Sequence, residues 1–448
     1  MRLLLFHGYM LRGTGSNIYN ANLAPALARL GHEVHLLCQD REVELEGVRI
    51  HRPDIHGLLP VYVKDPYEGF EVKAFPELSE AELERYLDDN VRCVRSVAAA
   101  AGGIDLALAN HLVMGPAILA RAGVAPFAAK VHGSALEYTV KPHPRFVPYA
   151  EQGARAAAAV LVGSRHTAES LWSVLPGVEG LREKTRLGPP GVDTRRFRPR
   201  EGEAREGRVV YVGKLIVSKG VDLLLAAWPL VHAAHPRARL QVAGYGEYEP
   251  ALRQLLAALE AGEVEAALAV ARRGRAPEGG EEKPLPILSA FLADPPPGYA
   301  EAARAAAGSV EFLGRLEHHE VARLLPTADA LVMPSTFPEA FGMVAVEAAA
   351  CGALPVSAAH SGMLEVSRRL AAALPAEAAP LASFPVGPGA PAAIAARLVR
   401  WLSLPERTRE ASRAALVEAV DRLWSWEGVA RAVIAAAQGN LAVLPLPE

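Results

Sequence analysis

The sequence predicts an α/β protein of two doubly wound, Rossmann-like domains that face each other across a cleft. Three observations lead to this prediction. The chain has 448 residues, which is too long for one ordinary hydrophobic core and suits two. Short apolar runs alternate with helical patterns in the first half, and the same alternation begins again near residue 208. A polar, Arg-rich stretch at 197–208 separates the two series, as an interdomain linker would.

The first series of strands and helices predicts a parallel sheet. Residues 18–32 are apolar at helical spacing, and Gly31 is expected to end this helix. Alternating strands and helices are joined by crossover connections, which make the strands parallel and leave helices on the sheet faces. The apolar runs that we interpret as buried strands are 3–6, 34–37, 104–109, 127–132 and 159–163.

The second series predicts a second sheet of the same kind. A helix is expected over 221–235, after the first strand. Between Gly246 and Val310 lies an unusually long excursion, with helical runs and then Pro- and Gly-rich stretches that we expect to be exposed loops. The final helix, 408–438, is too apolar for a free tail, and its two tryptophans suggest that it docks or kinks there. The strands are expected at 208–215, 239–246, 310–314, 329–335 and 352–358.

Composition excludes several classes of protein. Hydrophobic residues make up 51% of the chain and charged residues 22%, which is typical of a globular protein. The net charge of −3 gives no overall basic field, so we expect no nucleic-acid partner. The opening run "MRLLLFHGYM" is too short for a signal peptide or a membrane span, and no stretch of about 18 uninterrupted apolar residues occurs elsewhere. The three cysteines are far apart, which argues against a disulfide framework or zinc site and fits a reduced, cytoplasmic setting.

Ligands in doubly wound folds bind at the carboxyl ends of the strands, so the loops there are the candidate site. Gly13 and Gly15 follow the first strand, where they could bring backbone N–H groups to an anion or form a plain turn into the helix. Lys214 and Lys219 follow the first strand of the second series. Two lysines beside a helix start suit a diphosphate, although most lysines serve solubility.

Two carboxylates, Glu339 and Glu347, lie eight positions apart. In one continuous helix they would point about 80° apart, so they would not share a face. Pro338 and Gly342 argue that Glu339 lies in a loop and that a helix begins near residues 342–344. A carboxylate repels phosphate, so Glu347 is expected to accept hydrogen bonds from neutral hydroxyls such as those of a ribose. The alternative is an ordinary first-turn acid that complements the helix dipole.

The segment "PSTFPEAFGMVAVEAAACGALPVSA" resembles the E-x7-E segment of the retaining GT-B glycosyltransferases of glycosyltransferase family 4. "KVHGSALE", "GPPGVDTRRFRP", "VGKLIVSKGVDLLLAAW" and "VAGYGE" also resemble that family and follow its order. The resemblance covers nearly the whole chain except about 262–308. It implies the GT-B fold, with an acceptor-binding domain at 1–200 and a nucleotide-sugar-binding domain at 201–410 that carries the insertion. The helical segment 411–448 is expected to pack back toward the first domain.

The resemblance also implies a role for each candidate residue. Glu339 would contact the transferred sugar and Glu347 the ribose, while Lys214 and Lys219 would bind the diphosphate. Lys214 replaces the more common Arg and so offers a point charge instead of a bidentate fork. His132 would lie close to the reactive face of the sugar. The backbone that would meet sugar and diphosphate belongs to Phe341, Gly342, Met343 and Val344, and that of Gly15 would approach donor and acceptor.

Other residues have weaker interpretations. His111 follows the strand at 104–109 and so borders the cleft, where it could contact an acceptor or pack. His318 and His319 lack mates for a metal site and are interpreted as exposed residues at a helix start. Ser361 stands where the family often has glycine, and Cys351 is expected to be a small core residue. The arginines at 195–200 could meet a membrane surface, although a solvated linker fits better.

The expected function is therefore transfer of a sugar from a nucleoside diphosphate sugar, with retained configuration, by His132, Glu339 and Lys219 as catalytic residues. The nucleotide sugar would be a co-substrate, and neither a cofactor nor a metal is expected. The acceptor could be a small molecule, a saccharide or a lipid-linked sugar, and the base, sugar and oligomeric state stay open. The alternatives are a non-catalytic nucleotide-sugar-binding protein, a GT-B phosphorylase or an epimerase. A dinucleotide oxidoreductase is disfavoured because "GTGSNIYN" lacks the third glycine of its fingerprint.

Overall fold

The computed structural model describes residues 1–13, 15–63, 67–200 and 207–447. The chain divides into two compact units. The first comprises Met1–Gly191 together with Trp424–Glu448, and the second comprises Val192–Leu423. We describe each unit by itself and call them unit 1 and unit 2.

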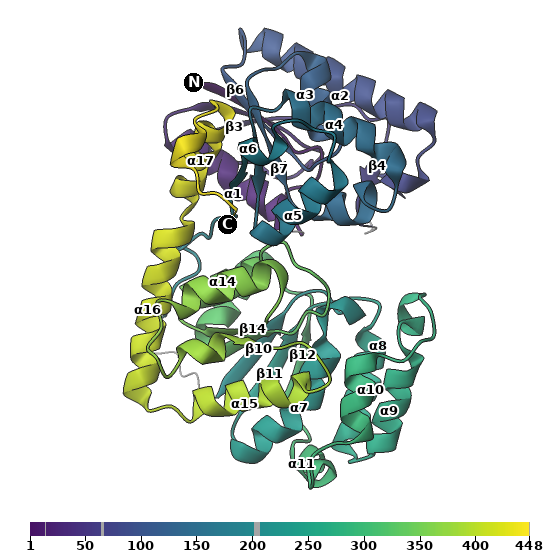
Figure 1. Cartoon of the computed structure of the whole chain (residues 1–448), viewed down its shortest axis with the longest axis vertical. Coiled ribbons are helices and arrows are strands. Elements are labelled where there is room, and N and C mark those ends of the chain that lie inside the picture. Colours follow the sequence, from purple (N-terminus) through teal and green to yellow (C-terminus); the bar gives the residue numbers. More distant parts are fainter. Residues whose placement is uncertain (14, 64–66, 201–206, 448) are drawn as a thin grey trace. The chain divides into compact units, whose positions relative to one another are not determined.

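Unit 1 is built on a parallel sheet whose strand order is β3-β2-β1-β6-β7-β8-β9 in the described residues (Figure 1). The order reverses direction at β1 and β6, which lie side by side, so the sheet is doubly wound as predicted. A separate parallel pair, β4 (Leu58–Val61) and β5 (Glu71–Ala74), lies outside it. The strands are β1 (Arg2–Phe6), β2 (Glu33–Leu37), β3 (Val48–His51), β6 (Leu106–Asn110), β7 (Phe127–Val131), β8 (Ala159–Val162) and β9 (Thr185–Leu187).

Helices cover both faces of this sheet because its buried strands are apolar on both faces. Along β1, Leu3 and Leu5 belong to one apolar cluster, whereas Leu4 and Phe6 belong to the other. The first cluster includes residues of α1 (Gly15–Arg29) and α17 (Trp426–Ala437). The second includes residues of α2 (Glu80–Ala100), α3 (Gly115–Ala122), α4 (Val147–Ala156), α5 (Arg165–Val174) and α6 (Leu181–Lys184).

Unit 2 repeats this plan. Its sheet is parallel, with the strand order β12-β11-β10-β13-β14-β15 in the described residues. The strands are β10 (Arg208–Val212), β11 (Arg239–Ala243), β12 (Val310–Gly314), β13 (Ala330–Met333), β14 (Leu354–Ala358) and β15 (Ser383–Phe384). The helices are α7 (Val221–Ala234), α8 (Glu249–Glu260), α9 (Val264–Arg273), α10 (Pro286–Ala293), α11 (Tyr299–Ala305), α12 (His318–Leu324), α13 (Met343–Ala350), α14 (Ser361–Ala371), α15 (Ala390–Leu402) and α16 (Glu406–Trp424).

The predicted fold class is confirmed, and every strand that the sequence predicts overlaps a strand of the structure. The short edge strands β3, β9 and β15 and the pair β4–β5 were missed. Strands β9 and β15 have only two or three residues, β3 and β5 lack a buried apolar run, and β4 contains Pro60, which argues against a strand. Among the helices of the described ranges, none combines the length and the apolar character that crossing a bilayer requires.

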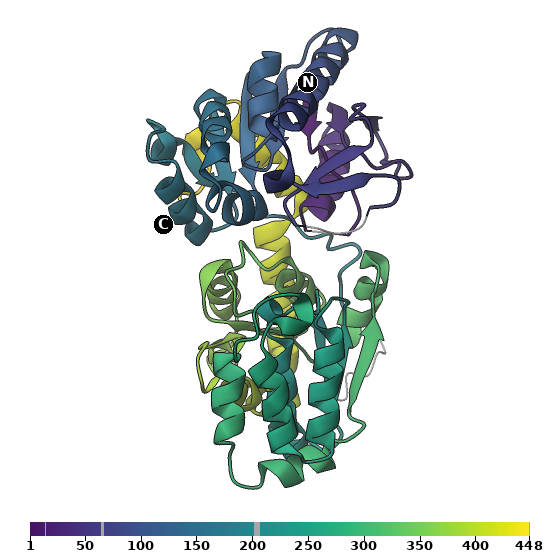
Figure 2. The ribbon, with the colours of Figure 1, turned by 90° about the vertical axis from the view of Figure 1, so that its right-hand side faces the viewer.

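The excursion at 262–308 is mainly helical. Helices α8, α9 and α10 lie side by side in unit 2, and α10 and α11 pack against α7 (Figures 1 and 2). Tyr299 anchors α11 because its buried hydroxyl donates a hydrogen bond of 2.6 Å to the carbonyl of Ala226 on α7. The turn-rich stretches between these helices are largely exposed, as expected, with Gly274, Glu278 and Leu285 as exceptions.

The bounds of the two units differ from those of the expected domains, which were 1–200, 201–410 and 411–448. Unit 2 begins at Val192 and ends at Leu423. It thus begins before the expected linker at 197–208, and Phe197, the first residue of that linker, is buried against His318. Residues 201–206 of the linker lie outside the described residues. Arg409 and Arg413 of α16 form ion pairs with the buried Asp329, which makes most of α16 part of unit 2.

The last helix expected from the sequence is two helices. Ser425 is extended, with φ −68° and ψ 144°, and separates α16 from α17 between the two tryptophans. Its hydroxyl accepts a hydrogen bond from the Gly428 N–H and so caps α17. Trp426 then packs edge-on against Tyr19 of α1, with ring centroids 5.5 Å apart, which docks α17 on unit 1.

Candidate active site

Three histidines gather at the carboxyl edge of unit 1. His7 follows β1, His111 follows β6 and His132 follows β7, and these strands are neighbours in the sheet. The rings of His7 and His111 are stacked with centroids 5.6 Å apart, and those of His111 and His132 are 5.0 Å apart. The structure therefore brings together His132 and His111, the two site histidines that the sequence singled out in this half, and adds His7.

All three histidines are held neutral. Burial lowers the pKa of His7 to about 4, although its hydrogen bonds to Asn17 and to the Met10 carbonyl act in the opposite direction. Burial, followed by the charge of His7, lowers the pKa of His111 well below its ordinary value. The pKa of His132 is lowered in the same way by burial and then by His111, Lys130 and His7. At neutral pH the cluster therefore offers lone pairs and N–H groups but no positive charge.

His111 has an unusual environment. Its backbone φ is +67°, and its ring lies 4.5 Å from that of Tyr62 and 5.5 Å from that of Tyr9, centroid to centroid. The residue is buried, and neither ring nitrogen has a hydrogen-bond partner within the described residues. A buried polar group without a partner is costly, so packing alone explains His111 poorly.

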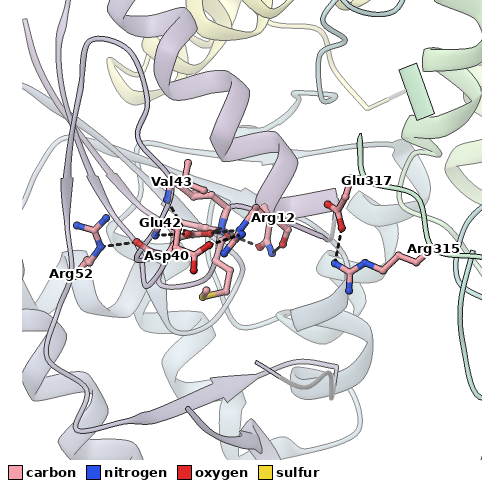
Figure 3. A network of polar contacts seen from close by, with 11 residues as sticks. Arg12, Asp40, Glu42, Val43, Arg52, Arg315 and Glu317 are labelled. Carbon is pink, nitrogen blue, oxygen red and sulfur yellow. Dashed lines mark hydrogen bonds and ion pairs between the residues drawn. The ribbon is translucent and has the colours of Figure 1, made fainter. Parts of the chain in front are cut away.

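The glycine-rich loop after β1 is tied to the loop after β2 through Asp40 (Figure 3). One carboxylate oxygen of Asp40 accepts from the Leu11 N–H at 3.2 Å and from Arg12 Nε at 3.4 Å. The other accepts from the N–H groups of Glu42 and Val43, each at 3.1 Å. Asp40 is fully buried, and sequence reasoning missed it because nothing local distinguishes this Asp from a turn residue.

Gly15, the predicted contact in this loop, is the first residue of α1, and Thr14 lies outside the described residues. Gly13 has φ +98°, with open space where a Cβ would be, so it is glycine for its backbone angle and not for a close approach. Asp40 holds the described part of this loop in place through Leu11 and Arg12, and a role of Gly15 in ligand binding stays a prediction.

In unit 2, Lys219 and Glu339 form an ion pair. Lys219 ends a 3₁₀ turn (Val217–Lys219), and Gly220 follows with φ +67°. A Cβ at Gly220 would lie 2.0 Å from the carbonyl oxygen of Pro334, so only glycine fits where this turn meets the loop after β13. The Ser335 hydroxyl also donates to Glu339, at 2.9 Å. The structure therefore brings together two of the three predicted catalytic residues.

The backbone around Glu339 is fixed by the start of α14. The Ser361 hydroxyl accepts from the Glu339 N–H at 2.9 Å, and the Gly362 N–H donates to the Glu339 carbonyl at 2.9 Å. A Cβ at Gly362 would lie 2.3 Å from the carbonyl oxygen of Ala340. His360 Nε2 lies 2.7 Å from the Ser335 carbonyl, which can only accept, so His360 is the donor. Ser361, which departs from the expected glycine, holds Glu339 in place.

The helix that the sequence predicts after this loop is α13, and it begins where expected. Gly342 is its N-cap with φ +93°, followed by Met343 and Val344, and Phe341 is buried beside them. Glu347 lies one turn into α13 and its side chain is only 6% exposed. The N–H groups of the first turn and a buried carboxylate thus belong to the same short helix.

The interpretation of His318 as an exposed residue was wrong. His318 begins α12, but its Nε2 lies 2.9 Å from Glu347 Oε1, and its ring packs 4.9 Å from that of Phe197. No local pattern links two residues 29 positions apart, so the sequence could not have shown this pair. His319, its neighbour, is exposed as expected. Within the described residues, no group of three or more His, Cys, Asp or Glu side chains is placed to hold a metal ion.

Lys214 lies with a different set of partners from Lys219. Its Nζ is 6.0 Å from the ring centroid of Tyr245, and the guanidinium of Arg315 is 5.1 Å from the same centroid. Arg315 also pairs with Glu317 at 3.2 Å (Figure 3). Two cations therefore share one aromatic ring, and sequence reasoning missed Arg315.

The insertion reaches the turn that carries Lys219. Glu278, in a 3₁₀ turn (Ala276–Glu278), accepts a hydrogen bond of 2.6 Å from the Val217 N–H. Its other carboxylate oxygen lies 3.1 Å from Arg275, and its side chain is only 7% exposed. Val217 is the first residue of the turn that ends at Lys219, so a residue of the insertion fixes the start of that turn.

Family comparisons agree with this geometry. The family model "Glycosyltransferase Family 4" matches residues 13–196, and two models described as "Glycosyl transferases group 1" match residues 206–273 and 300–417. A mannosyltransferase of Corynebacterium glutamicum, named as GDP-mannose-dependent, is 27% identical over 319 residues, which are 61% of this chain and 68% of the relative. A D-inositol 3-phosphate glycosyltransferase of Actinosynnema mirum is 28% identical over 77% of this chain and 76% of the relative.

Solved structures show the same fold. Sucrose-phosphate synthase from Thermosynechococcus elongatus superposes with a TM-score of 0.62 at 20% identity, over 98% of this chain and 99% of that one. HepE from Anabaena, solved with UDP-glucose, gives 0.60 at 16% identity, over 98% and 99%. Together with the family models, these likenesses identify the chain as a member of the GT-B glycosyltransferases of the family 4 type.

Proposed function

We propose that this enzyme transfers a hexosyl group from a nucleoside diphosphate sugar to an acceptor, with retention of configuration and without a metal ion. The observation that carries the proposal is the contact of Lys219 with Glu339. An ammonium group complements a phosphate, and a carboxylate complements sugar hydroxyls. A cation and a carboxylate in contact therefore suit a ligand in which a diphosphate adjoins a sugar.

The remaining groups of unit 2 fit the rest of that donor. The N–H groups of the first turn of α13, at Gly342–Val344, face outward from a helix start and favour negative charge. Glu347 is buried and already accepts from His318, and its carboxylate has further lone pairs for the ribose hydroxyls. Lys214 and Lys219 would stabilise the charge that the departing diphosphate gains, which is the task that a metal ion performs elsewhere.

Unit 1 would supply the acceptor side and the face of the sugar. His132 is proposed to act on the reacting sugar, Gly15 to approach donor and acceptor, and His111 to contact the acceptor. The two unpartnered nitrogens of His111 give that contact a physical reason, since a hydroxyl of the acceptor could satisfy one of them. The relatives suggest acceptors with many hydroxyls, because their names include inositol phosphate and phosphatidylinositol mannoside.

Retention is favoured over inversion by the state of His111. An inverting enzyme needs a general base near the acceptor hydroxyl, with a pKa close to the working pH. His111 is the histidine in unit 1 that the sequence offered for this task, and burial lowers its pKa well below the ordinary value. It is therefore a weak base at neutral pH. In a retaining reaction the leaving phosphate takes the proton of the acceptor on the same face, and no protein base is needed.

The experiment begins with thermal-shift screening against UDP-, GDP- and ADP-sugars. A donor at 100 times its dissociation constant should raise the free energy of unfolding by roughly 2.7 kcal/mol. The stabilising donor is then incubated with candidate saccharide, inositol phosphate and lipid-linked acceptors in the presence of EDTA. Proton NMR of the first product should show the anomer of the donor.

Each other outcome would contradict a specific part of the proposal. A product of inverted configuration would overturn retention, and loss of turnover in EDTA would overturn metal independence. Stabilisation by a donor without transfer or hydrolysis would favour the alternative, a non-catalytic nucleotide-sugar-binding protein. A cytoplasmic location and peripheral contact with a membrane stay predictions, which cell fractionation tests.

A further inference from the structure

A chain of hydrogen bonds runs from His132 through the interior of unit 1 to the loop after β1. It begins at His132 Nε2, 2.8 Å from the side-chain oxygen of Asn110. The amide nitrogen of Asn110 lies 2.8 Å from the oxygen of Asn20, and the nitrogen of Asn20 lies 3.1 Å from His7 Nδ1. His7 Nε2 lies 3.0 Å from the oxygen of Asn17. All but His132 are buried, with exposures of 2% or less.

Backbone carbonyls decide which way each amide in this chain points. A carbonyl oxygen can only accept, so the side-chain nitrogen of an Asn beside it must be the atom that faces it. Each of the three asparagines has such a neighbour, and its oxygen is therefore turned to the member that precedes it in the chain, counted from His132. The pairs are Asn110 Nδ2 with Phe6 O at 3.1 Å, Asn20 Nδ2 with Ser16 O at 2.9 Å, and Asn17 Nδ2 with Arg12 O at 2.6 Å.

The orientations of the amides fix the proton positions on both histidines. His7 Nε2 faces the oxygen of Asn17 and the carbonyl of Met10 at 2.9 Å, so it carries the proton. Its Nδ1 then accepts from Asn20, as a neutral imidazole requires. By the same reasoning His132 Nε2 must donate to the oxygen of Asn110.

We propose that Asn110 is a positioning residue that holds His132 as the neutral Nε2–H tautomer, so that Nδ1 presents a lone pair to the substrate. That lone pair accepts a hydrogen bond from a hydroxyl and repels a phosphate oxygen. His132 therefore recognises a hydroxyl of the sugar or acceptor and not the diphosphate. The statement that His132 meets substrate rests on the proposed function, whereas the tautomer rests on the hydrogen bonds alone.

The groups around His132 oppose a second proton on its ring. Tyr19 of α1 packs its ring edge-on at 5.0 Å, His111 comes from the end of β6, and Lys130 is buried on β7. His7 faces it from the end of β1. Lys130 and the two histidines can only add positive charge, so the surroundings favour the neutral ring that Asn110 orients.

The direct test is nitrogen NMR of the full chain with ¹⁵N-labelled histidine, with the His132 signals assigned by their loss in His132→Ala. At pH 7 we expect Nε2 to carry the proton and Nδ1 to be of the unprotonated type. Protonation on Nδ1, or an imidazolium, would overturn the proposal. This measurement needs no variant of Asn110 to fold.

The functional test uses Asn110→Asp. The added carboxylate still accepts from Nε2 but favours the charged ring, so His132 should gain a proton on Nδ1. Turnover near pH 7 should fall at least tenfold, with little change in donor affinity, and should recover as the pH is raised and His132 deprotonates. The matched control is Asn90→Asp. Asn90 is a buried residue of α2 whose side-chain amide donates to the Tyr86 carbonyl, and it is not part of this chain of hydrogen bonds.

Failure of this inference and failure of the proposed function give different results. If the Nε2–H tautomer is found but His132→Ala and Asn110→Asp keep full turnover, the role of His132 is wrong and the tautomer stands. If His132→Ala abolishes turnover but NMR shows a proton on Nδ1, the role stands and this inference is wrong. A loss in Asn110→Asp that no pH restores would mean that Asn110 serves folding only.

Discussion

The site residues of unit 1 and those of unit 2 are built from different chemistry. In unit 1 the candidate groups are neutral: three histidines with lowered pKa values, oriented by asparagine amides. In unit 2 they include charged groups: Lys219 pairs with Glu339, and the Glu347 carboxylate accepts a hydrogen bond from His318. Under the proposed function, the charged groups of unit 2 would meet the diphosphate, whereas unit 1 would present polar but uncharged groups to hydroxyls. Four predictions test this contrast, in order of expected size.

Two buried groups, His7 in unit 1 and Asp222 in unit 2, should make opposite contributions to the pH dependence of stability. In unit 1, the pKa of His7 is about 4 in the folded state and 6.5 when unfolded, so the unfolded chain binds more protons between these values. The free energy of unfolding should therefore fall as the pH drops from 6.5 to 4, by roughly 3 kcal/mol from His7. In unit 2, burial raises the pKa of Asp222 from 3.8 to about 7. Backbone hydrogen bonds lower this pKa, and the charge of Glu278 raises it further. Here stability should fall as the pH rises from 3.8 to 7, by roughly 4 kcal/mol.

Hydrogen exchange of the full chain, read separately for β1 and α7, measures this difference. Each contribution is isolated by comparing the wild type with His7→Gln or with Asp222→Asn at several pH values. The His7 difference should grow toward neutral pH, and the Asp222 difference should grow toward acid pH. Slopes of the same sign would contradict the assignment of a neutral polar core to unit 1 and of a buried acid to unit 2.

The second prediction concerns the charge on the phosphate side. Lys219→Ala should weaken binding of a nucleoside diphosphate by about ten- to hundredfold, because a hydrogen bond to a charged group contributes roughly 1.5–3 kcal/mol. Binding of the bare nucleoside should change little. Isothermal titration of both ligands measures this, with Lys283→Ala, an exposed lysine of the same unit, as the control. Equal weakening of both ligands would mean that Lys219 serves folding.

Part of the fold and of the candidate site could be predicted from the sequence. Most strands, the start of α13 and the positions of Lys219, Glu339 and His132 were predictable because each depends on a local apolar run or on a glycine or proline nearby. The hydrogen-bond partners of these residues could not be predicted. "ALANH" drew attention to His111, whereas its neighbour Asn110 is the residue that bonds His132. Whether Asn110 meets a partner depends on the strand beside it, and such tertiary contacts leave no trace in a short stretch of sequence.

The third prediction compares Glu347, which is proposed to bind the nucleotide, with His318, which holds the Glu347 carboxylate in place. Glu347→Ala should lower nucleotide affinity at least tenfold, since two ribose hydroxyls would lose a charged acceptor. His318→Ala should cost less, a few-fold, because His318 only orients that carboxylate through one hydrogen bond. His319→Ala, the exposed neighbour, is the matched control and should have no effect. If His318→Ala matches the loss in Glu347→Ala, His318 itself contacts the nucleotide.

The smallest expected effect comes from the insertion. Glu278 fixes the Val217 N–H at the start of the turn that ends at Lys219, and the hydrogen bond is 2.6 Å long and partly buried. Removing it leaves a backbone donor without its partner at a cost of about 1–3 kcal/mol, part of which would appear as a looser turn. Glu278→Ala should therefore lower the affinity for the nucleoside diphosphate three- to tenfold, with little effect on the affinity for the nucleoside. This is the same pattern as for Lys219→Ala, but smaller.

Two variants serve as controls for Glu278→Ala. Glu278→Gln keeps an acceptor and should restore most of the affinity, and Glu282→Ala, an exposed acid of the same loop, should match the wild type. If Glu278→Ala binds both ligands as the wild type does, the insertion is a tolerated addition to unit 2, and the turn at Lys219 is held by other contacts, such as the hydrogen bond of 2.9 Å from the Thr336 N–H to the Ser218 carbonyl.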